Sequence, residues 1–235
     1  LAVPRRADDT LDPARAIHGT AVTALLIGDP PGRSPGLVPR ADVVAVDAFH
    51  RAAGDERSDA FTLVAGMEFL ADQGLRVVNM SLAGPSNTVL EEGVRRMQDR
   101  GVIIIAAAGN GGPRAEPAYP AAYDGVIAGT AVDTQGGIYR RAGQGDHIDL
   151  AAPGVQVWTA ASIRGARPKT GTSFAAPFVS AAAAQLLVAD PDMTATEVVN
   201  RLRDTARDLG PAGQDPVFGA GLIQVDGLCS GQVSR

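Results

Sequence analysis

Three polar side chains in this sequence stand beside small, turn-forming residues and could together cleave an acyl bond. Ser173 lies in GTSFAAP, His18 in HGTAV and Asn110 in AAAGNGG. A seryl hydroxyl becomes a nucleophile when a nearby base takes its proton, and histidine is the commonest base at neutral pH. A side-chain amide can donate hydrogen bonds to the oxyanion that develops during the reaction. These residue types therefore indicate nucleophilic acyl transfer.

Each candidate also has an ordinary structural interpretation. A serine that opens a helix is most often an N-cap. A lone histidine is most often a satisfied surface residue, and an asparagine between glycines commonly fills a left-handed turn position. Ser173, His18 and Asn110 are therefore candidates that need support from other residues. The other histidines, His50 and His147, lie in polar, turn-like surroundings and are predicted to be solvated.

The residues around Ser173 predict an unusual helix start. Pro177 lacks a backbone donor and crowds the carbonyl four residues earlier, which is that of Ser173 itself. Gly171 allows a sharp turn, and the small Ala175 and Ala176 allow close packing. We expect the hydroxyl of Ser173 to be held near the positive end of this helix.

Strands and helices alternate ahead of this helix. Apolar runs predict strands, and helical spacing of apolar residues predicts the helices between them. The strands are expected at 42–49, 76–82, 101–108, 126–131 and 148–151, and the helices at 58–73 and 88–100. A capping box of Thr194 and Glu197 predicts a further helix. This order predicts a three-layer α/β fold, with a mostly parallel central sheet and helices on both faces.

The carboxyl ends of parallel strands meet at one edge of a sheet, where ligand sites gather. The polar segments SLAGP (81–85) and GNGGP (109–113) follow two of the expected strands. We therefore expect them to lie at the same edge as the candidate residues.

Composition limits the kinds of partner. The 235 residues are 45% hydrophobic, which suits a single domain, with a lead-in at 1–17, a core at 18–225 and a tail at 226–235. The net charge of -5, without a basic run, argues against nucleic acid. No membrane span is expected from the apolar stretches. The lone Cys229 cannot close an internal disulfide.

The motifs HGT, SLAGP, AAAGNGG, AYPAAY and GTSFAAP, in this order, resemble those of the subtilisin-like serine peptidases. The resemblance extends from His18 to about Val225, and histidine precedes serine, unlike in the α/β-hydrolases. It implies that Ser173 is the nucleophile and that His18 is the general base and later the acid. It also implies that Asn110 and the backbone N–H of Ser173 form the oxyanion hole.

The resemblance also implies a groove for polypeptide substrates. Ser81, Leu82, Ala83 and Gly84 would pair with the substrate backbone as an added strand. The pocket for the side chain before the scissile bond would be lined by Ala107, Ala108, Gly109, Ala118, Tyr119 and Pro120. Since none of these residues is charged, we expect a hydrophobic or uncharged preference, in a pocket made shallower by Ala118.

The sequence departs from the family pattern in its missing aspartate. The family orients its histidine with an aspartate in a DTG or DSG motif that ends an early strand, and no such motif occurs here. The favoured hypothesis is that the chain is part of a longer protein, with this aspartate upstream of Leu1. Two alternatives remain open: recruitment of Asp8, Asp9 or Asp12 from the polar lead-in, and an inactive, degenerate scaffold. Ala21 and Ala83 are smaller departures, at positions where histidine and glycine are usual.

The leading functional hypothesis is a serine endopeptidase that forms an acyl-enzyme on Ser173. The alternative is a catalytically degenerate peptide-binding module of the same fold. A lipase or esterase of another fold is disfavoured by the motif order and by the absence of GxSxG.

The family resemblance carries further expectations. Its members are commonly exported with an inhibitory pro-segment, which implies a secreted or extracytoplasmic protein and a pro-segment as partner. They often carry structural calcium, but the loop DPPGRSPG offers only the carboxylate of Asp29. We predict no metal site in that loop and no cofactor.

Overall fold

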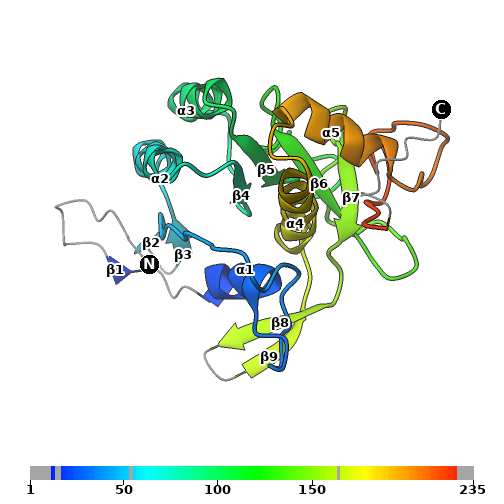
Figure 1. Ribbon diagram of the computed structural model, residues 1–235, viewed down its shortest axis with the longest axis horizontal. Helices are drawn as coiled ribbons and strands as arrows, with labels where there is room; N and C mark the ends of the chain where they lie inside the picture. Colours follow the sequence, from blue (N-terminus) through cyan, green and yellow to red (C-terminus); the bar gives the residue numbers. More distant parts are fainter. Residues whose placement is uncertain (1–11, 14–16, 53–54, 163–164, 227–235) are drawn as a thin grey trace.

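The computed structural model describes residues 12–13, 17–52, 55–162 and 165–226. Its centre is a four-stranded parallel sheet in the order β4-β5-β6-β7 (Figure 1). The strands are β4 (Val77–Met80), β5 (Ile103–Ala107), β6 (Ile127–Val132) and β7 (Leu150–Pro153). Strands that follow one another in sequence are neighbours in the sheet, as short crossovers favour.

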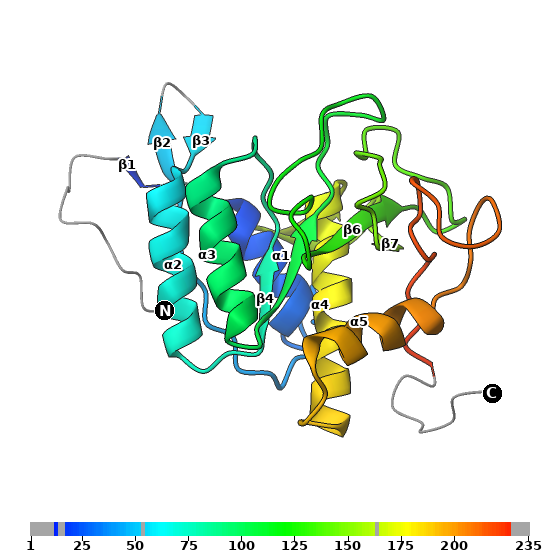
Figure 2. The same cartoon turned by 90° about the horizontal axis from the view of Figure 1, so that it is seen from above.

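Helices cover both faces of this sheet. On one face α2 (Ala60–Asp72) and α3 (Thr88–Asp99) lie side by side (Figure 2). The other face carries α4 (Thr172–Ala189), which contacts all four strands, and α5 (Ala195–Asp204). Helix α1 (Ile17–Ile27) packs against α4. The predicted three-layer α/β class is confirmed.

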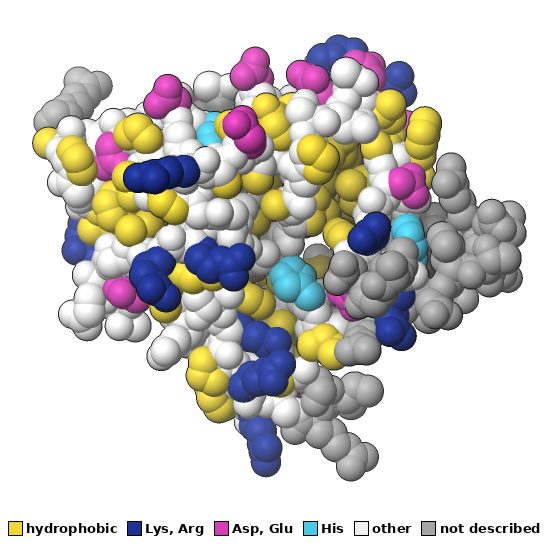
Figure 3. Space-filling model, turned by 180° about the vertical axis from the view of Figure 1, so that it is seen from behind, with side chains coloured by type: hydrophobic (Ala, Val, Ile, Leu, Met, Phe, Trp, Pro, Cys, Tyr) yellow, Lys and Arg dark blue, Asp and Glu magenta, His cyan; other side chains and the backbone are white. Residues whose placement is uncertain are grey.

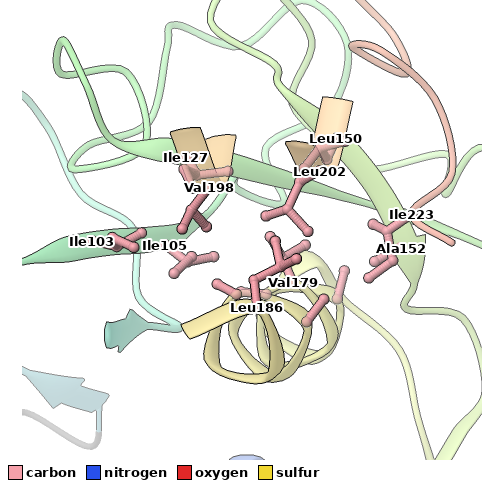
Figure 4. Packing of buried hydrophobic residues seen from close by; sticks show 14 of the residues in the cluster. Ile103, Ile105, Ile127, Leu150, Ala152, Val179, Leu186, Val198, Leu202 and Ile223 are labelled. Atoms are coloured by element: carbon pink, nitrogen blue, oxygen red, sulfur yellow. The ribbon is translucent and has the colours of Figure 1, made fainter. Parts of the chain in front are cut away.

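Strand β5 explains why this part of the sequence is apolar throughout. Every residue of β5 is buried. Ile103 and Ile105 belong to the cluster with α4 and α5 (Figure 4), whereas Ile104 and Ala106 pack on the side of α2 and α3. Because successive side chains of a strand point to opposite faces, a strand covered on both faces has no polar side.

Helix α4 approaches the sheet closely because its inner residues are small. Ala175, Ala176 and Ala183 are fully buried, and a Cβ on Gly129 of β6 would lie only 3.5 Å from the Cα of Ala176. By length and composition alone α4 could also cross a membrane, which the sequence analysis overlooked. However, 61% of it is buried inside the protein, as in a core helix.

The ends of the helices follow the capping signals in the sequence. The predicted capping box is present: Glu197 N donates to Thr194 Oγ1 at 3.2 Å, and Thr194 N donates to Glu197 Oε2 at 2.8 Å. Gly74 and Gly101 follow the C-cap residues of α2 and α3 and have φ of 71° and 77°. These positive angles suit glycine and stop the helices there.

The prediction of a strand at 42–49 is wrong. This segment has no regular secondary structure, and Val43 is 37% exposed. A strand needs a neighbour to satisfy its backbone, and in the described part of the chain β4 pairs with β5 alone. The segment leads into a small antiparallel sheet of β1 (Asp12–Pro13), β2 (His50–Ala52) and β3 (Asp55–Arg57). Strand β1 and the first residue of α1, Ile17, lie in the stretch expected to be irregular.

An antiparallel hairpin of β8 (Val157–Ser162) and β9 (Gly165–Lys169) was not expected from the sequence. Thr159 on β8 donates from its hydroxyl to the carbonyl of Ala21 in α1 at 2.6 Å. Trp158 donates from Nε1 to the carbonyl of Arg33 at 2.7 Å. The hairpin therefore fixes α1 and the loop after it, just before the chain enters α4.

Charges of both signs are distributed over the surface. The face in Figure 3 carries Asp and Glu as well as Lys and Arg side chains, with hydrophobic side chains exposed between them. On α3, Glu92 binds both Arg95 and Arg96. Such exposed pairs contribute little to stability.

Candidate active site

Ser173 lies in the first turn of α4, which begins at Thr172. The N-cap residue is Gly171, with φ of 154° and no side-chain hydrogen bond, so the N-cap interpretation of Ser173 is wrong. Thr172, Phe174 and Ala175 are buried, whereas Ser173 is partly exposed. Ser173 is therefore the residue of this turn that is accessible from solvent.

The side chain of Asn110 is fixed against the start of α4. Its Oδ1 accepts a hydrogen bond from Thr172 N at 3.0 Å and lies 3.3 Å from Thr172 Oγ1. Thr172 Oγ1 in turn accepts from Gly109 N at 3.1 Å. Because Oδ1 is held by Thr172, the Nδ2 donors of the amide point away from that residue. Asn110 is thus oriented as a donor beside Ser173. The role of Thr172 was not expected from the sequence, where its only signal was its place in GTS.

His18 lies near the same helix start. It is the second residue of α1, and its ring centroid is 5.6 Å from that of Phe174, the residue after Ser173. Ala21, Val22 and Leu25 of α1 pack with Phe174 in one buried cluster. These contacts bring the imidazole of His18 to the beginning of α4.

The pKa of His18 is lowered from its ordinary value. Although the residue is exposed overall, the largest cause of the lowered pKa is partial loss of water around the ring. The negative charge of Glu56 raises the pKa and the positive charge of Lys169 lowers it. A lowered pKa keeps the ring neutral, and able to accept a proton, to a lower pH than in an ordinary histidine.

The structure leaves the third member of the proposed triad unassigned. Asp8 and Asp9 lie outside the described residues. Asp12 is on β1, where its backbone pairs with Arg51 of β2. Glu56 on β3, which the sequence analysis did not consider, is a carboxylate whose charge acts on His18.

The two segments assigned to substrate binding are joined to each other. Gly84, just beyond β4, forms an antiparallel bridge with Tyr119. Its N–H donates to Tyr119 O at 2.9 Å, and Tyr119 N donates back to Gly84 O at 2.9 Å. Ser81 and Leu82 are half-buried, whereas Ala83 and Gly84 are exposed. Backbone from both segments therefore lies along one stretch of surface beside the end of the sheet.

Gly109 leaves no room for a side chain in this region. Its φ is 92°, and a Cβ there would lie 2.7 Å from the Cβ of Ala118. Ala107 and Ala108 are each 1% exposed, and Pro120 is also buried. The methyl group of Ala118 thus packs directly against backbone at 109.

Metal-binding groups are not gathered in the described part of the chain. No group of three or more His, Cys, Asp or Glu side chains there could hold an ion. In the loop after α1, Asp29 is exposed and its carbonyl accepts from Gly32 N at 2.8 Å. Cys229 lies outside the described residues.

The prediction that His147 is solvated is wrong. It is half-buried, and its Nε2 is buried without a hydrogen-bond partner among the described residues. Burial lowers its pKa, which Asp149 and Asp146 raise. His50 is half-buried on β2.

Proteases are among the solved structures that are similar to this chain. The structure of the prenylagaramide maturation protease PagA superimposes with a TM-score of 0.81 and 25% sequence identity, covering 97% of this chain and 84% of that one. An S41 psychrophilic protease gives a TM-score of 0.81 at 26% identity, covering 91% of this chain and 79% of that one. The fold, together with a serine at the start of α4, is that of a serine peptidase.

The family follows from the sequence. The model of the Subtilase family matches residues 4–221, and the chain belongs to that family. Subtilisin DY of Bacillus licheniformis is 35% identical over 214 residues, which make up 89% of this chain and 76% of the relative. The minor extracellular protease Epr of Bacillus subtilis (strain 168) is 32% identical over 210 residues, which make up 88% of this chain but 32% of Epr. The family resemblance inferred from the motifs is confirmed.

Proposed function

We propose that the protein is a serine endopeptidase in which Ser173 attacks the carbonyl carbon of a peptide bond. His18 takes the proton of the hydroxyl as Oγ bonds to carbon, and then gives it to the amine that leaves when the C–N bond breaks. Water, deprotonated by the same imidazole, hydrolyses the resulting ester and restores Ser173.

The observation that carries this proposal is the fixed amide of Asn110 at the start of α4. A tetrahedral intermediate on Ser173 places negative charge on the former carbonyl oxygen. The Nδ2 donors of Asn110, oriented by the bond between Oδ1 and Thr172 N, and the backbone N–H of Ser173 would stabilise that charge. Donors that are already oriented need no rearrangement as the charge develops.

The substrate we propose is an extended polypeptide. The exposed backbone of Ala83 would pair with it as an additional strand, whereas the N–H and carbonyl of Gly84 are already bonded to Tyr119. The side chain before the scissile bond would meet Gly109, Ala118 and Tyr119, which favours an uncharged residue there. Secretion and control by an inhibitory pro-segment are proposed from the family, in which Epr is named an extracellular protease.

A fluorophosphonate probe tests the proposal. Ser173 Oγ would bond to phosphorus, the P–F bond would break with loss of fluoride, and His18 would take the hydroxyl proton. We expect one label, on Ser173, when the folded full-length protein is treated with the probe and digested for mass spectrometry. A folded protein that binds peptides but takes no label would overturn the proposal and favour the peptide-binding module.

Replacing Asn110 by alanine is expected to lower kcat by about a hundredfold to a thousandfold, with little change in KM, because the oxyanion loses one donor. The control is Asn110→Asp, which keeps an acceptor for Thr172 N but has no donor for the oxyanion. If donation is the role of Asn110, steady-state kinetics will show that aspartate is no better than alanine. Recovery of kcat in the aspartate variant would instead indicate that Asn110 acts only by capping α4.

A further inference from the structure

A line of hydrogen bonds connects the middle of α4 to its own first turn through strand β4. Ser180 Oγ lies 3.0 Å from Asn79 Oδ1, and Asn79 Nδ2 donates to Ser81 Oγ at 2.9 Å. Ser81 Oγ donates to the backbone carbonyl of Ser173 at 2.7 Å. The line thus ends on the residue proposed as nucleophile.

Pro177 explains why the carbonyl of Ser173 is available. In a regular helix this carbonyl would accept from the backbone N–H of residue 177. Proline has no N–H, so the helix itself cannot supply that bond. An unpaired carbonyl in a half-buried position is costly, and the hydroxyl of Ser81 takes the place of the missing donor.

The direction of donation makes the bonds depend on one another. A serine hydroxyl carries one proton, and that of Ser81 goes to the carbonyl of Ser173. The oxygen of Ser81 can then only accept a further hydrogen bond, and Asn79 Nδ2 donates to it. The amide of Asn79 is held in turn from Ser180, which is 4% exposed and lies 3.0 Å from Ala176 O as well.

We propose that Asn79 is a positioning residue for Ser173, acting through the hydroxyl of Ser81 and the carbonyl freed by Pro177. This inference rests on the proposed function, because Ser173 supplies both the attacking oxygen and one backbone donor of the oxyanion hole. Both groups are attached to the Cα of Ser173, which also carries the carbonyl that Ser81 holds. A shift of about 1 Å in a reacting group can cost roughly a hundredfold in rate.

The test measures the rate of fluorophosphonate labelling per folded molecule, because this small probe makes no extended contacts along residues 81–84. We expect Asn79→Asp, which cannot donate to Ser81 Oγ, and Ser81→Ala to lower the labelling rate each by about tenfold to a hundredfold. The double variant should be no slower than the slower single variant, because both changes interrupt one line. Ser81→Thr keeps the hydroxyl and is expected to keep most of the rate.

A change at Pro177 separates positioning from a general loss of stability. Pro177→Ala supplies a backbone N–H to the same carbonyl, so in the Ser81→Ala background it should restore part of the labelling rate. If Asn79→Asp is labelled at the wild-type rate, the positioning role is overturned. It is also overturned if the effects of Asn79→Asp and Ser81→Ala on the labelling rate multiply in the double variant.

Hydrogen exchange of residues 171–176 keeps this inference separate from the proposed function. We expect faster exchange in Asn79→Asp than in the wild type whether or not the wild type is labelled. An unlabelled wild type would overturn the peptidase proposal alone, whereas unchanged exchange would overturn the positioning role.

Discussion

Replacing Ser173 by alanine is expected to lower kcat for peptide hydrolysis by about a millionfold, leaving only the rate that binding and the oxyanion donors provide. Alanine removes the attacking oxygen while keeping the backbone N–H at the same position. Since Ser173 makes no side-chain cap to α4, the change should not weaken the helix start. Substrate affinity and thermal stability should therefore remain close to those of the wild type.

Hydrolysis of a chromogenic peptide, followed over hours to days, measures this loss. Ser34→Ala is a matched control, because the hydroxyl of Ser34 is buried without a hydrogen-bond partner among the described residues. That variant should keep wild-type kcat. Residual activity of Ser173→Ala within tenfold of the wild type would mean that the nucleophile lies elsewhere.

Replacing His18 by alanine is expected to cost nearly as much as the loss of Ser173, about a millionfold in kcat, because the hydroxyl then has no base. The two residues act as one unit in the proposed reaction. The double variant should therefore be no slower than either single variant, rather than slower by the product of the two effects.

His50→Ala is the control for the second prediction, since His50 lies on β2 and has no role in the proposed reaction. It should keep wild-type kcat in the same peptide assay. A double variant of Ser173 and His18 that is far slower than both single variants would contradict the shared role.

The core strands and most helices could be predicted because their signals are local. Strand β5 is apolar in every residue since both its faces are covered, and the Thr194–Glu197 box lies within one helical turn. The segment 42–49 is also largely apolar, apart from Asp42 and Asp47, without forming a strand. Sequence alone does not say whether a neighbouring backbone is present to pair with it.

The residue types of the candidate site could be predicted, but not the contacts that hold them. Ser173 resembled an N-cap, yet the first amide of α4 is capped by Asn110 from a distant loop. Likewise, Pro177 marked the carbonyl of Ser173 as unusual, but its partner Ser81 lies 92 positions away in sequence. Partners this far apart leave no periodicity to detect.

The bond between Thr172 N and Asn110 Oδ1 also links helix capping to inhibitor binding. An anion that accepts from Nδ2 polarises the amide and strengthens the acceptor character of its oxygen. Binding of a tetrahedral, negatively charged inhibitor should therefore protect the first turn of α4 from opening. By thermodynamic reciprocity, opening of this turn must weaken such an inhibitor by the same free energy by which the inhibitor opposes opening. A substitution that frays the turn should therefore weaken the inhibitor even when it touches neither the inhibitor nor Asn110.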